Sequence, residues 1–91
     1  MPDLDITAAD QHTYDVTITA DDGSRTDHTV HVSPAWLAGL GLSAAQEPVL
    51  VRASMLYLLE REPPSSILPS FGLDEIVRYF PQYQDEITDL L

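Results

Sequence analysis

The three histidines have the widest chemical range of any side chains in this sequence, because the chain contains no cysteine. His28 and His31 stand three positions apart in a segment that alternates as a strand does, so they point to opposite faces. His12 is expected to pair near Val32 and therefore to lie on the other face from His31. Ligands of one metal ion must converge on it. The spacing predicts no metal site, and no motif indicates a cofactor.

Carboxylates are the second group of candidates, since the chain carries 15 of them. A catalytic pair needs one carboxyl desolvated while the other stays ionised. Here Asp21-Asp22 precedes Gly23 in a turn signal, and Asp74-Glu75 begins a predicted helix, whose positive end favours acids. The sequence also lacks the nucleophile, phosphate-loop and dinucleotide-binding glycine motifs. We therefore predict that the protein is not an enzyme and has no catalytic residues.

The charge balance argues against another class of function. Against 15 acidic side chains stand only 4 basic ones, all arginine, which gives a net charge of −11. Binding nucleic-acid phosphates requires many lysines and arginines, so the composition argues against a nucleic-acid partner. Three explanations of the acidity stay open. They are adaptation to a high-salt cytoplasm, mimicry of a nucleic acid by carboxylates, and the ordinary residue usage of a GC-rich genome.

The cellular compartment can also be predicted from the sequence. A chain without cysteine fits a reducing compartment. No apolar run approaches the roughly 20 residues that a membrane-spanning helix needs, and Met1-Pro2-Asp3 lacks the basic start of a secretory signal. We therefore expect a cytoplasmic protein with no membrane partner. Its lysine-free composition, rich in aspartate and threonine, resembles that of proteins from salt-loving prokaryotes.

The chain length of 91 residues allows one small domain, 1–91. Residues 1–11 have little periodicity and are expected to form a flexible arm, whereas residues 12–33 are expected to form a β-hairpin. A three-residue loop at 21–23 would place Tyr14 opposite Val30 and align the apolar faces of both strands. The outward face of the hairpin then carries polar side chains, namely Asp15, Thr17, Thr19, Arg25, Asp27, Thr29 and His31.

The remainder, residues 34–91, is predicted to be helical. Ser33-Pro34 is typical of a helix start, and a longer central helix should begin between residues 44 and 48 and end before Pro63-Pro64. Shorter helical segments are expected over residues 74–80 and 82–91. The predicted fold class is α+β, with an N-terminal β-hairpin packed on a mostly apolar central helix and several short helices around it.

The central helix carries apolar residues on nearly all sides, which predicts that it is buried on nearly all sides. One stripe contains Leu50 and Tyr57, and a second contains Val51, Met55 and Leu58. We expect the second stripe to pack against a second copy of the chain in a two-fold homodimer. The alternative is that the C-terminal segment folds back over it.

An aromatic cluster over residues 79–83 suggests either core packing or a docking surface. Together with the second stripe it supports the function we favour, a non-enzymatic interaction or regulatory protein that acts through a protein partner or self-association. The residues expected to contact the partner are Val51, Met55, Leu58, Tyr79, Phe80 and Tyr83. An acidic nucleic-acid mimic remains a further alternative.

Two resemblances add to this interpretation. Residues 29–61, a short alternating strand followed by a proline-led helix, a glycine turn and a longer helix, resemble the ribbon-helix-helix fold of small prokaryotic repressors and antitoxins. That resemblance implies a dimeric DNA-binding regulator in which Thr29, His31 and Ser33 read the bases of the DNA. The C-terminal half, with Ile76-Val77-Arg78-Tyr79-Phe80-Pro81, resembles small prokaryotic proteins of no assigned function and implies a compact fold only.

Overall fold

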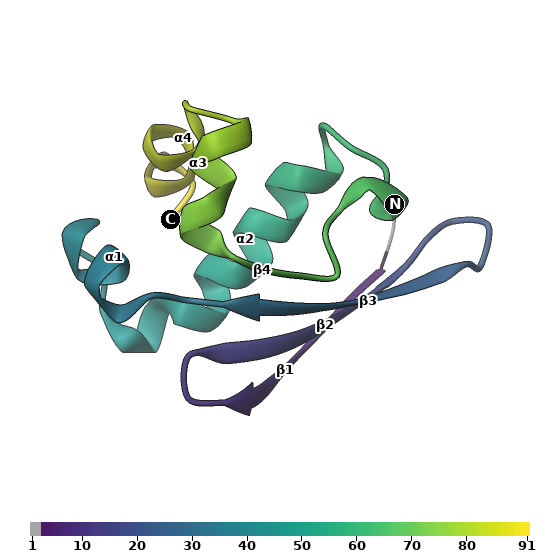
Figure 1. Ribbon diagram of the computed structural model, residues 1–91, viewed down its shortest axis with the longest axis horizontal. Coiled ribbons are helices and arrows are strands. Elements are labelled where there is room, and N and C mark those ends of the chain that lie inside the picture. Colours follow the sequence, from purple (N-terminus) through teal and green to yellow (C-terminus); the bar gives the residue numbers. More distant parts are fainter. Residues whose placement is uncertain (1–2) are drawn as a thin grey trace.

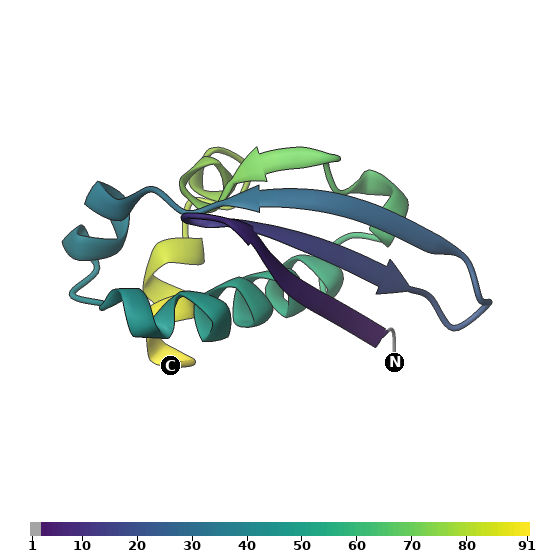
Figure 2. The same ribbon diagram turned by 90° about the horizontal axis from the view of Figure 1, so that it is seen from below.

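The computed structural model, which describes residues 3–91, has an α+β fold in which the longest helix, residues 47–59, runs along one face of a four-stranded sheet (Figures 1 and 2). The strand order is β1-β2-β3-β4, with the first three antiparallel and β4 parallel to β3. The strands are β1 (Asp3–Asp10), β2 (Thr13–Thr19), β3 (Arg25–His31) and β4 (Ser70–Gly72). The helices are α1 (Pro34–Gly39), α2 (Glu47–Leu59), α3 (Ile76–Tyr79) and α4 (Tyr83–Asp89).

The β2–β3 hairpin has the register expected from its apolar pattern. Tyr14 pairs with Val30, and a three-residue loop joins the strands, since Ala20 N–H donates to the Ser24 carbonyl across it at 2.8 Å. Gly23 adopts φ +90°, a conformation that side chains disfavour, which explains a glycine there. This register places Tyr14, Val16, Ile18 and Val30 on the buried face of the sheet.

Residues 3–10 do not form the flexible arm that the sequence analysis expected, but pair with β2 as the edge strand β1. Leu4 lies opposite Ile18 and Ile6 opposite Val16, so both add to the apolar face, where they are partly buried against the core. Asp3 and Asp5 alternate with these residues and point to the other face. Because the segment has low overall hydropathy, this alternation was not recognised as a strand in the sequence. Residues 1–2 of the expected arm lie outside the described part.

The region 34–91 is not wholly helical, because β4 adds a strand to the sheet beside β3. Phe71 pairs with Val30 and is buried, whereas its neighbour Ser70 points to solvent. The Pro69 carbonyl accepts a hydrogen bond from Thr29 N–H at 2.8 Å. A strand of three residues carries too little alternation to be predicted from sequence.

The helix boundaries follow local capping chemistry. The Ser33 hydroxyl accepts a hydrogen bond from Trp36 N–H at 3.3 Å, and Pro34 occupies the first turn of α1, as expected. Gly41, at φ +76°, ends this helical segment. Proline also occupies the first turn of α2, where it has no hydrogen bond to break, so Pro48 does not interrupt the helix.

The C-terminal segment covers one side of α2. Tyr83 is fully buried, hydrogen bonds with the Ser54 hydroxyl at 2.6 Å, and contacts the Tyr57 ring at a centroid distance of 5.2 Å. On its other face, the Tyr83 ring stacks on Trp36, with centroids 6.2 Å apart. Arg61 bridges the same elements by a 3.1 Å contact with Glu86. Val51 and Met55, from the stripe that the sequence assigned to a second copy, are fully buried within this chain, whereas the contacts of Tyr83 fall on the neighbouring side of α2.

In the part of the chain that the structure describes, no helix combines the length and hydropathy needed to cross a membrane.

Candidate functional site

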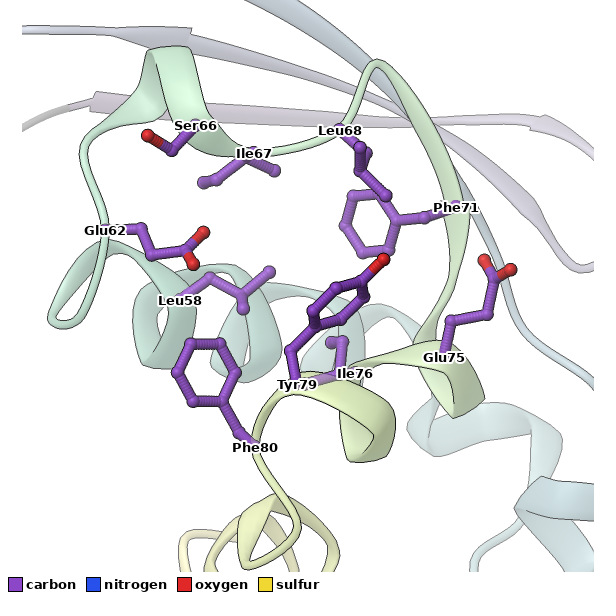
Figure 3. A pocket seen from close by; sticks show the side chains of 10 residues that line it. All are labelled: Leu58, Glu62, Ser66, Ile67, Leu68, Phe71, Glu75, Ile76, Tyr79 and Phe80. Atoms are coloured by element: carbon purple, nitrogen blue, oxygen red, sulfur yellow. The ribbon is translucent and has the colours of Figure 1, made fainter.

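An apolar hollow opens between the end of α2, the segment before β4, and α3 (Figure 3). Its volume is about 110 Å³, or about 510 Å³ when the open space at its mouth is included. Ten residues line it: Leu58, Glu62, Ser66, Ile67, Leu68, Phe71, Glu75, Ile76, Tyr79 and Phe80. A hollow of this size accommodates a large side chain of a partner molecule.

The hollow has a buried apolar floor and an exposed apolar rim. Leu58, Ile67 and Phe71 form part of the floor and are each 6% exposed. On the rim, the side chains of Leu68 and Tyr79 are 47% and 66% exposed. Exposed large apolar side chains beside a concave apolar surface are more typical of docking sites than of the rest of a protein surface. The hollow is therefore the strongest candidate site in the described residues.

Two carboxylates interrupt this apolar lining. Glu75 is fixed, because its Oε2 accepts a hydrogen bond from Gly72 N–H at 2.6 Å. Glu62 follows the end of α2, and its carboxylate points into the hollow above Leu58 (Figure 3). Within residues 3–91, no side chain pairs with the Glu62 carboxylate or hydrogen bonds to it. The hollow thus combines apolar surface with an available negative charge.

The structure separates the six residues expected to contact a partner into two groups. Leu58, Tyr79 and Phe80 line the hollow. The other three, Val51, Met55 and Tyr83, are fully buried in the core and offer no surface. Four further apolar residues of the hollow were not predicted from sequence, namely Ile67, Leu68, Phe71 and Ile76. The apolar pair Ile67-Leu68 in an otherwise polar connector was a usable signal.

The residues implied by the ribbon-helix-helix resemblance are placed differently from that fold. Thr29 and His31 lie on the outward face of β3, and Ser33 caps α1. A two-chain ribbon requires a strand with a free edge, whereas β3 pairs with β2 on one side and with β4 on the other. In this arrangement β3 cannot pair with the same strand of a second copy.

The three histidines do not converge. His28 is buried between the sheet and the segment before β4, where its Nδ1 lies 2.8 Å from the Leu68 carbonyl oxygen and its Nε2 2.9 Å from the Thr26 hydroxyl. His31 is exposed beside Thr13. His12 turns inward, with Nδ1 2.7 Å from the Glu47 carboxylate. Within residues 3–91, no three acidic or histidine side chains are grouped closely enough to hold a metal ion.

The outward face of the sheet carries aspartates that alternate with threonines across the strands. Asp5 lies opposite Thr17, which in turn lies opposite Asp27, and Asp15 lies opposite Thr29. The Thr17 hydroxyl donates a hydrogen bond to Asp27 at 2.9 Å. Because no aspartate on this face stands directly across from another in these pairs, the sheet avoids the strongest like-charge repulsion.

A buried carboxylate joins the sheet to the start of α2. Glu47 is 2% exposed, and its two oxygens are bound by His12 and by the Tyr14 hydroxyl, which donates a hydrogen bond at 3.0 Å. The N-terminal position in α2 also favours a negative charge. None of these three residues lines the hollow, and we interpret the cluster as a structural link between the two layers.

The Tyr14–Glu47 contact predicts a loss of stability at alkaline pH. Burial, the hydrogen bond to Glu47 and the charge of Glu47 raise the pKa of Tyr14 to about 12, from about 10 in an unfolded chain. The folded state therefore holds this proton more tightly. The stabilisation is fully present below about pH 10 and is lost as the pH rises from 10 to 12. Burial also raises the pKa values of Tyr57 and Tyr83, which act in the same direction.

Urea unfolding at a series of pH values between about 8 and 12 checks this expectation. Tyr14→Phe should flatten the decline of the unfolding free energy without abolishing it, because Tyr57 and Tyr83 still contribute. An unchanged pH dependence in Tyr14→Phe would show that this hydroxyl is not held as the structure indicates.

Comparison with known proteins returned no matching family model, no matching curated protein and no matching solved structure.

Proposed function

We propose that the protein is a non-enzymatic interaction or regulatory module, and that its hollow receives a large apolar side chain from a protein partner. The observation that carries the proposal is the pairing of a buried apolar floor with the exposed rim residues Leu68 and Tyr79. The free energy falls when a partner side chain covers exposed apolar surface around a hollow and displaces water from it.

The proposal includes a role for the rest of the fold. The β2–β3 hairpin packed on α2 would provide a rigid support, which holds Leu58 on α2 and Phe71 on β4 in the floor of the hollow. A site supported by packed elements changes little on binding, which lowers the entropic cost of association.

Selection from a random peptide display library tests this proposal. Peptides of about 12 residues are long enough to present one anchoring side chain in extended or helical form. We expect the selected peptides to share a large aliphatic or aromatic residue. Tyr79→Ala and Leu68→Ala should each weaken the binding of a selected peptide by about tenfold or more, the effect typical of a central contact residue.

Leu90→Ala is the matched control, because Leu90 is an equally exposed apolar residue, at 65%, and does not line the hollow. This variant should bind the selected peptides with unchanged affinity. Failure to enrich any peptide sequence would overturn the proposal, and so would selected peptides whose affinity is insensitive to Tyr79→Ala and Leu68→Ala. All three substitutions are at exposed sites, where effects on stability are small.

A further inference from the structure

We propose that the hollow is specific for a partner segment in which a lysine or arginine adjoins the large apolar residue, and that Glu62 and the aromatic rings of the hollow recognise this cation. The inference rests on the proposed function, since it names the chemistry of the segment that the hollow binds. The ligand class is an ammonium or guanidinium group carried on an apolar stem.

The first support is the position of Glu62. Its carboxylate lies just beyond the C-terminal end of α2, where the carbonyl dipoles of the helix disfavour a negative charge. It is half-buried above the apolar floor and is directed into the hollow (Figure 3). Among the described residues no cation compensates it. A ligand cation placed in the hollow would offset the repulsion between the Glu62 carboxylate and the helix carbonyl groups. It would also compensate for the hydration that the carboxylate loses in its apolar surroundings.

The second support is the number of aromatic residues that line the hollow. Phe71, Tyr79 and Phe80 contribute three rings to the hollow (Figure 3). The faces of such rings attract cations, and guanidinium groups stack on them especially well. The chain already uses this contact nearby, where the guanidinium carbon of Arg61 lies 3.5 Å from the centroid of the Tyr57 ring.

Residues 3–91 do not supply a cation to this site. Arg61 is held outside the hollow by Tyr57, Glu60 and Glu86. None of the four arginines lines the hollow, whose charged lining residues, Glu62 and Glu75, are both acidic. The cation must therefore come from the partner.

The overall charge favours the same class of partner. A net charge of −11 attracts basic segments and repels acidic ones over distances set by the ionic strength. This general field increases the association rate, whereas the contact with Glu62 supplies a local preference for the cation. The two contributions can be separated by experiment.

The experiment uses a peptide obtained by the selection described above and a copy in which its arginine is replaced by citrulline, the uncharged analogue of nearly equal shape. Binding is measured by isothermal titration against the full chain. We expect citrulline to weaken binding by roughly threefold to tenfold, as for a partly desolvated ion pair with a cation–π contribution. Glu62→Gln should cause a similar loss, and citrulline should then cause little further loss.

Glu60→Gln is the matched control, because Glu60 is exposed, lies two residues from Glu62, and contacts Arg61 at 3.5 Å outside the hollow. It removes one negative charge from the same end of α2 and should leave the peptide affinity within about twofold, as expected of an exposed charge. Equal losses in Glu60→Gln and Glu62→Gln would assign the preference to the general field and would overturn the inference.

The outcomes distinguish failure of this inference from failure of the proposed function. Selected peptides that contain the apolar residue without an adjoining cation, or that bind equally with citrulline, overturn the inference and leave the proposed function in place. If no peptide is selected, or if binding does not depend on Tyr79 and Leu68, the proposed function fails and the inference fails with it.

Discussion

Met55→Ala is expected to lower the free energy of unfolding by about 2–5 kcal/mol, the range measured when a buried methionine or leucine is truncated to alanine. Met55 is fully buried in the core that α2 shares with the sheet and the C-terminal segment. Removing its side chain leaves a cavity that the surrounding elements can fill only in part. Urea unfolding followed by the fluorescence of Trp36, the only tryptophan, measures this loss.

The same experiment tests whether Met55 belongs to a core or to an interface between two copies. A residue buried within one chain changes stability by the same amount at every protein concentration, whereas an interface residue couples stability to association. We therefore expect the unfolding midpoint of Met55→Ala to be independent of concentration. Val49→Ala is the control, because Val49 lies on the same helix but is 60% exposed, and it should change stability by less than about 0.5 kcal/mol.

Tyr83→Phe is expected to destabilise the protein by about 1–3 kcal/mol, although it removes a single oxygen atom. The Tyr83 hydroxyl and the Ser54 hydroxyl are both fully buried and hydrogen bond at 2.6 Å. The substitution leaves the Ser54 hydroxyl without this partner in an apolar environment, and an unsatisfied buried polar group costs more than a lost hydrogen bond alone.

A double-mutant cycle separates this effect from simple packing. Ser54→Ala combined with Tyr83→Phe removes both polar groups, so the double variant should be more stable than Tyr83→Phe alone. Because the Trp36 ring stacks on Tyr83, the native fluorescence should stay nearly constant if the ring keeps its place. A double variant whose losses simply add would contradict a direct interaction between the two hydroxyls.

The hairpin could be predicted from sequence because its information is local. Alternation in residues 12–18 fixed which face is buried, and the Asp21-Asp22-Gly23 turn fixed the register, so the pairing of Tyr14 with Val30 followed from both together. Helix α1 was equally predictable from Ser33-Pro34, whose capping geometry involves neighbouring residues only. The structure also confirms the α+β class, which was predicted from the same local patterns.

The other parts of the structure depend on contacts between distant residues and were not predictable in this way. β4 is a strand because Phe71 can pair beside Val30, which no pattern within residues 70–72 reveals. Likewise, the apolar pattern of α2 predicted burial on nearly all sides, but Val49 and Arg52 are exposed, so one side of the helix is left uncovered. The pattern also did not reveal that Tyr83 of α4 covers the side that carries Ser54 and Tyr57. The hollow depends on such distant contacts, because part of its apolar lining comes from β4 and the segment before it, and the rest from α2, α3 and the residue after α3. Only three of its seven apolar lining residues, Leu58, Tyr79 and Phe80, were therefore anticipated.

The parallel pairing of β3 with β4 has a consequence for the order in which the molecule assembles. Antiparallel β2 and β3 are joined by a short turn and can form early, whereas β4 can dock only after residues 32–69 have closed a long loop at an entropic cost. The hollow takes its outer wall from the end of that loop, where His28 and Thr29 hold the Leu68 and Pro69 carbonyls. The hollow that we propose as a binding site is thus completed by a strand whose docking requires the longer loop closure, and a partner bound there is expected to stabilise β4 against local unfolding more than the hairpin.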